Sequence, residues 1–149
     1  MNELRKIKDD ELLQNFSNLV SQEREATAQV VAHLSEIDRR KLYAKEGYSS
    51  LFSYGVEKYH YSEGACYRRI YAARMSQKFP EIISILEAGK ITLAVIALIG
   101  GHLTEENKES LLKAVVFQSK REAEKTIGRF FPKTEATLDI IRRLPVAQN

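Results

Sequence analysis

The chain has 149 residues, of which 44% are hydrophobic and 29% charged, as expected for one globular domain or for a domain with a helical extension. Its net charge of +3 is too small to indicate nucleic-acid binding by itself, and its one cysteine, Cys66, excludes an intramolecular disulfide. The charged amino terminus and the shortness of the apolar run 91–99 predict neither a signal peptide nor a membrane span, so we expect a cytoplasmic protein.

Apolar residues recur at helical spacing along the chain, and no long period-two alternation predicts a strand. The first helix is expected to begin near Asp9 or Asp10 and to reach about Ile37, a length of about 40 Å. That length exceeds what a small core covers, so the helix predicts a homodimer in which part of it packs on a second chain. Its apolar stripe consists of Leu12, Phe16, Leu19, Val20, Val30, Val31, Leu34 and Ile37.

Serine, threonine, proline and glycine residues mark the helices that follow. Gly47 is expected to end the first helical region, and Ser49 to cap a helix that reaches about Tyr59. Ser62 is expected to cap the next helix, which runs to about Lys78. The remaining signals are Pro80 and Gly89 around a short helix, Thr92 as the cap of an apolar helix that ends at Gly100-Gly101, Thr104 as the start of a helix to about Phe117, and the capping box Ser119–Glu122 before a last helix that ends ahead of Pro132.

These signals predict an all-α, multi-helix domain with a long N-terminal helix and a central helix-turn-helix. Residues 1–48 would form the long helix and its turn, residues 49–131 the helix-turn-helix domain, and residues 132–149 a tail or linker. In the central part, a helix from Leu51, a turn at 60–62 and a helix capped by Ser62 have the spacing of a DNA-binding helix-turn-helix.

The second of these helices has two different faces. Cys66, Ile70 and Ala73 fall on one side and are expected to pack on the preceding helix. Between Lys58 and Lys78 the basic residues exceed the acidic ones by four, and all seven tyrosines lie between residues 43 and 71. Basic and hydroxyl side chains contact phosphates, sugars and base edges, so we predict that this helix binds double-stranded DNA. The predicted contact residues are Ser62, Gly64, Tyr67, Arg68, Arg69, Tyr71, Arg74 and Lys78.

Residues 51–129 resemble the helix-turn-helix region of the ParB family of partition proteins. The resemblance is carried, in order, by Phe79-Pro80-Glu81-Ile82-Ile83, Glu87-Ala88-Gly89-Lys90-Ile91-Thr92 and Ser119-Lys120-Arg121-Glu122. It implies that the helix after Ser62 is a recognition helix. One position departs from the pattern: His60 stands where that family prefers glycine, and a positive φ is uncommon for any other residue, although histidine is enriched there.

Nearly the whole chain is also similar to the amino-terminal helical region of bacterial HNH endonuclease-type proteins. The matching stretches are 23–27, 33–40, 47–52, 61–65 and 142–145, for example Gly47-Tyr48-Ser49-Ser50-Leu51-Phe52. The resemblance implies a DNA-targeting role, either as a separate regulator or beside a nuclease module that lies outside these residues.

Catalysis by this chain is not expected. The three histidines, His33, His60 and His102, stand alone in their segments, and no metal-binding spacing is present, so neither a metal site nor a cofactor is predicted. Cys66 is expected inside the helical hairpin rather than beside a base. Two alternatives to DNA binding remain open: a protein-interaction or oligomerisation domain without nucleic-acid binding, and RNA binding by the same basic face.

Overall fold

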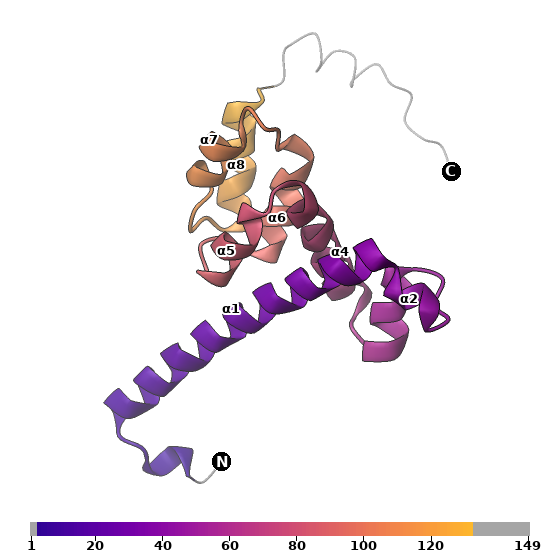
Figure 1. The fold of residues 1–149 in the computed structure, drawn as a ribbon. Helices are drawn as coiled ribbons and strands as arrows, with labels where there is room; N and C mark the ends of the chain where they lie inside the picture. The colour runs from indigo at the N-terminus through magenta and orange to yellow at the C-terminus, as the bar shows by residue number, and fades with distance from the viewer. Residues whose placement is uncertain (1–2, 133–149) are drawn as a thin grey trace, which may run out of the picture.

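The computed structural model describes residues 3–132, and every regular element within that range is helical (Figure 1). This confirms the predicted all-α, multi-helix class. None of the described helices is both long and apolar enough to cross a membrane. The elements are η1 (Leu4–Lys6), α1 (Asp9–Arg40), α2 (Leu42–Lys45), α3 (Leu51–Ser53), the π-helical turn η2 (Tyr54–Lys58), α4 (Glu63–Lys78), α5 (Glu81–Glu87), α6 (Leu93–Ile99), the 3-10 turn η3 (Gly100–His102), α7 (Lys108–Ala114) and α8 (Lys120–Phe130).

Helix α1 is the long N-terminal helix that the sequence predicts. Its 32 residues correspond to about 48 Å. Acidic residues fill its first turn, where they complement the helix dipole, and it ends at Lys41, which has a left-handed φ of 52°. The C-terminal half packs on α4 and α5, and Ala28 and Val31 are fully buried there. The N-terminal half, which we call the arm (residues 9–23), extends away from the other helices (Figure 1).

Two groups of buried residues hold the helices together. The main core joins α1, α4, α5, α6, α7 and α8, with Ile82, Ile96 and Leu111 fully buried. A second, smaller core consists of Leu51, Tyr54, Cys66 and Ile70, with residues of α1 packed against it. Because this second core lies between α3, η2 and α4, it fixes the orientation of the amino-terminal half of α4.

Most of the predicted helix ends are confirmed. Ser62 accepts a hydrogen bond from the Ala65 amide and Thr92 one from the Val95 amide, while Ser119 and Glu122 form a reciprocal capping box. Gly89 follows α5 with a φ of +73°, the conformation that glycine adopts at least cost.

Three predicted boundaries differ from the structure. The cap before α3 is Ser50 rather than Ser49, because Ser50 exchanges hydrogen bonds with Ser53. The predicted helix from Leu51 to Tyr59 is one short α-helical turn followed by the π-helical turn η2. Helix α7 begins only at Lys108, since Thr104 and Asn107 first close a turn by bonding to each other's backbone amides. The tail from residue 133, including 142–145, lies outside the described residues.

Candidate nucleic-acid interface

The segment from Ser50 to Lys78 contains a short helical stretch, a sharp corner and helix α4. At the corner, the amide of His60 donates to the carbonyl of Val56 at 3.1 Å, and the amide of Tyr61 donates to the carbonyl of Gly55 at 3.3 Å. His60 has a φ of 59°, so a histidine occupies the left-handed region that favours glycine. Ser62 then returns to extended backbone and caps α4.

Close contact between Gly55 and Cys66 determines how η2 packs on α4. A Cβ atom at Gly55 would lie 2.5 Å from Cys66 Sγ, so only glycine allows this approach. The Cys66 thiol donates to the carbonyl of Phe52 at 3.6 Å. Burial raises the pKa of Cys66, against a smaller lowering by the charge of Arg69. The thiol is therefore a packed side chain that keeps its proton.

The inner face of α4 is the one that the sequence predicts. Cys66, Ile70 and Ala73 are 2%, 6% and 0% exposed. The opposite side begins with Ser62 and Gly64, which are exposed at the start of the helix. Neither residue has a bulky side chain, and the Arg68 guanidinium lies over the first turn beside Gly64.

Two stacked tyrosines continue this outward face. The Tyr67 ring is 58% exposed and lies 6.1 Å from the Tyr71 ring, with an interplanar angle of 27°. Tyr71 is half-buried because its ring covers Gly100, where any Cβ atom would collide with it. Burial, followed by the charge of Tyr67, raises the pKa of Tyr71, so its hydroxyl keeps its proton and remains a hydrogen-bond donor. Tyr67 is thus the accessible ring of the pair, and Tyr71, packed on Gly100, supports it.

Arg68 is exposed and lines a hollow together with a second cation that comes from another helix. Its guanidinium extends back toward Gly64, where Nη1 would be 3.2 Å from a Cβ atom. Arg68 and Lys120, the first residue of α8, line one hollow of about 460 Å³ whose other walls are small and apolar residues of α6. A basic pair separated by a concave, apolar surface can receive an anionic backbone on either side of the hollow.

Two predicted contact residues are engaged within the protein. Arg69 donates to the carbonyl of Ala65 at 3.0 Å, and its guanidinium lies 4.9 Å from the centre of the Tyr61 ring. It is only partly exposed and points away from the Tyr67 side of the helix. Arg74 is exposed but forms an ion pair with Asp38 of α1 at 3.4 Å. Lys78 is exposed at the C-terminal end of α4.

The structure therefore brings Ser62, Gly64, Tyr67, Arg68 and Tyr71 onto one outward surface, which we call the α4 face. Arg74 and Lys78 extend this surface toward α1, whereas Arg69 lies on another side. The sequence reasoning missed Lys120, and it also missed a small hollow of about 190 Å³ beside Tyr67. That hollow is lined by Ser50, Phe52, Tyr67, Ile70, Tyr71 and Arg74.

No local signal in the sequence links Lys120 to α4. The residue follows a capping serine and reads as part of an ordinary helix start, and only the tertiary packing of α4, α6 and α8 brings it near Arg68. Phe52 is different, since its position near the start of a capped helix could have marked it as a candidate surface aromatic. It is 39% exposed and lines the hollow beside Tyr67.

Metal-binding geometry does not occur among the described residues, where no three histidine, cysteine or acidic side chains form a group that could hold an ion. His33 Nδ1 lies 2.6 Å from the carbonyl of Gln29, which fixes the proton on Nδ1, and His102 stacks on Phe131 with ring centres 4.8 Å apart. Comparisons of the chain with protein-family models, with curated proteins and with solved structures found no match.

Proposed function

We propose that the chain is a non-catalytic DNA-binding module that contacts double-stranded DNA through the α4 face. In this proposal α3 and η2, the corner at 60–62 and α4 act as a helix-turn-helix, and α4 is the recognition helix. The observation that carries the proposal is the polarity of α4: Tyr67 and Arg68 are exposed while Cys66, Ile70 and Ala73 are buried. The resemblance to ParB-type and HNH-associated helical regions is consistent with a regulator or with the targeting region of a nuclease.

The α4 face has the chemistry that this role requires. A major groove about 12 Å wide admits one helix, and the small residues at the start of α4 permit close approach to it. Arg68 and Lys120 would contact phosphates on either side of their hollow, and the exposed ring of Tyr67 would reach sugars or base edges. Lys78 adds a charge at the far end of the helix. Arg74 contributes less, because Asp38 already neutralises part of its charge.

A fluorescence anisotropy titration with a labelled DNA duplex tests this proposal. Binding should weaken steeply as salt rises, and Arg68→Ala and Lys120→Ala should each lower the slope of log K against log salt by about 1. Lys113→Ala, which removes an exposed charge from α7, is the matched control and should leave the slope unchanged. Absence of duplex binding at low salt would refute the proposal, and preferential binding of single-stranded RNA in competition would favour the RNA alternative.

The arm supports a second candidate function, self-association through α1. Leu13, Phe16 and Leu19 are 66%, 65% and 61% exposed, so several large apolar side chains lie side by side in water. Contiguous apolar surface of this kind marks interaction sites. A protein-interaction role without DNA binding predicts a stable complex that survives charge reversal at Arg68 in sedimentation. It also predicts no duplex binding by wild type in the anisotropy titration, and that second measurement distinguishes the two functions.

A further inference from the structure

A groove beside the C-terminal half of α1 has apolar and aromatic walls. Its volume is about 450 Å³, within the range of sites that bind side chains or small molecules. His33 and Gln29 stand at one edge, and the hydroxyl groups of Tyr54 and Tyr59 lie 3.3 Å apart at another. We call it the tyrosine groove; its lining residues are Gln29, Val30, His33, Leu34, Ile37, Tyr54, Tyr59 and Tyr61.

Three apolar residues of the arm, Leu12, Phe16 and Leu19, lie on the same face of α1 as this groove. Leu12, Phe16 and Leu19 follow one another at spacings of four and three residues. The same alternating spacing of four and three continues along the helix through positions 23, 26, 30, 33 and 37. This spacing is that of a coiled-coil seam, in which successive residues face one partner helix. The seam is apolar and uncovered in the arm, and it forms the floor of the tyrosine groove at 30–37.

We propose that two copies of the chain pair through antiparallel α1 helices, so that the arm of each copy fills the tyrosine groove of the other. In this register Leu12 lies opposite Ile37, Phe16 opposite His33 and Leu19 opposite Val30 of the second copy. The same contacts are made twice about a two-fold axis, which closes the assembly as a dimer. Each arm thereby covers its Leu12, Phe16 and Leu19, and each groove receives an aromatic side chain.

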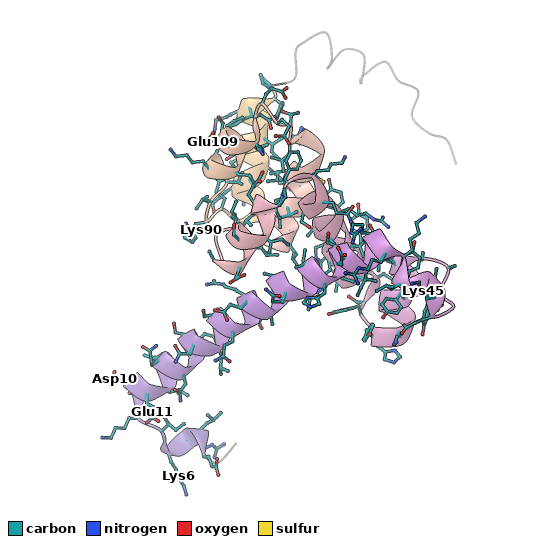
Figure 2. The ribbon with its side chains drawn as sticks, in the orientation of Figure 1. Lys6, Asp10, Glu11, Lys45, Lys90 and Glu109 are labelled. Atoms are coloured by element: carbon teal, nitrogen blue, oxygen red, sulfur yellow. The ribbon has the colours of Figure 1, made fainter. Side chains whose placement is uncertain are left out.

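The charges at the two ends of α1 select the antiparallel direction. Asp9, Asp10 and Glu11 form the first turn, whereas Arg39 and Arg40 form the last turn and Lys41 follows it. Figure 2 shows Asp10 and Glu11 at the far end of the arm and Lys45 beyond the opposite end of the helix. Glu36 bonds to both arginines, but it balances only one of the positive charges. In the proposed register Asp9 lies opposite Arg40, whereas parallel pairing would place like charges together.

One position of the seam opposes pairing, and it provides a test. Glu23 is exposed and lies next to Ala26 of the second copy, close to the two-fold axis. The two Glu23 carboxylates therefore approach each other, and their repulsion weakens the dimer. Glu23→Gln should tighten dimerisation by about two- to tenfold, because it removes this repulsion and keeps the size of the side chain.

The inference rests on the proposed self-association of α1 and does not depend on DNA binding. Sedimentation equilibrium of the full chain should show a dimer whose dissociation constant rises about 30-fold or more with Phe16→Glu, as for a central interface residue. Ser21→Glu adds the same charge on the opposite side of the arm and should leave the dimer intact. Phe16 is 65% exposed, so Phe16→Glu should leave the monomer folded, with the melting temperature that the Ser21→Glu variant shows when it is diluted to monomer. A chain that is monomeric at all concentrations overturns both the self-association and its geometry.

Disulfide trapping tests the register separately. Chains carrying Leu19→Cys should cross-link with chains carrying Val30→Cys in a mixture, and neither should cross-link with itself. Two copies of position 19 would lie about 16 Å apart along the antiparallel pair, beyond the reach of a disulfide. Wild type, in which Cys66 is the single cysteine, is the control for cross-linking through that residue; because Cys66 is 2% exposed, wild type should not cross-link. Cross-linking of Leu19→Cys alone, or a dimer that is insensitive to both Phe16→Glu and Val30→Glu, overturns the proposed register while leaving self-association in place.

Discussion

Cys66 Sγ lies where a side chain at Gly55 would begin, with only 2.5 Å between the sulfur and the position of a Cβ atom. Gly55→Ala should therefore destabilise the protein by about 1–3 kcal/mol through overpacking, measured by urea denaturation. Gly128 in α8 has open space around it, so Gly128→Ala is the matched control and should stabilise by about 0.5–1 kcal/mol. In the double variant Gly55→Ala/Cys66→Ala the loss should be partly recovered, and additive losses would contradict the proposed contact.

Asp38 controls how much of the Arg74 charge is available on the α4 face. Its carboxylate pairs with Arg74 at 3.4 Å and also accepts from Gln77 at 3.1 Å. Asp38→Asn keeps the hydrogen bond from Gln77 and removes the negative charge. We expect duplex DNA to bind about two- to fivefold more tightly, as the pair is exposed and its coupling is weak. The anisotropy titration measures this gain, which should vanish in Arg74→Ala; a gain that persists there would contradict the role of the ion pair.

His60 keeps a left-handed backbone conformation at the corner before α4. Its side chain is exposed, so substitutions there report mainly on the backbone. His60→Gly should stabilise the fold by up to about 1 kcal/mol, since glycine adopts a positive φ without strain but loses more entropy on folding. His60→Val should destabilise it, because a β-branched residue is disfavoured at this φ. Equal stability of the two variants in urea would show that the corner relaxes to another conformation.

The Glu36 carboxylate should titrate at unusually low pH. Hydrogen bonds from Arg39 and then from Arg40 lower its pKa to about 2. Because the pKa is lower in the folded than in the unfolded chain, the stabilisation is complete above the ordinary carboxylate range and is lost as pH falls toward 2. The melting temperature should therefore fall more steeply between about pH 4.5 and 2 for wild type than for Glu36→Gln. An NMR titration midpoint of Glu36 near the ordinary glutamate value would refute the interaction.

Much of the fold follows from signals that act over three or four residues. The caps Ser62, Thr92 and Ser119 and the glycine after α5 work through local hydrogen bonds and backbone conformation, and the sequence predicts each of them correctly. Ser49 and Ser50 both precede the same apolar residue, and the hydrogen bonds between Ser50 and Ser53 decide which of them is the cap. The π-helical turn was not predicted either, because it occurs where Gly55 packs on Cys66, a contact between residues that are eleven positions apart.

The candidate site divides in the same way. The outward position of Tyr67 and Arg68 follows from helical spacing relative to Cys66. The partners of Arg69 and Arg74 do not follow from helical spacing. Tyr61 meets Arg69 because the chain turns at the corner, and Asp38 meets Arg74 because α1 packs on α4. Lys120 joins the site from α8, more than fifty residues away, so only packing reveals it.

The distribution of tyrosines gives the molecule an intrinsic optical reporter. The chain contains no tryptophan, and all seven tyrosines lie between residues 43 and 71, so near-ultraviolet emission comes from the corner and its surroundings alone. Tyr67 and Tyr71 belong to the α4 face, whereas Tyr54, Tyr59 and Tyr61 line the tyrosine groove. Replacing one set at a time by phenylalanine would separate the two signals, and unlabelled protein would then report which surface a ligand occupies.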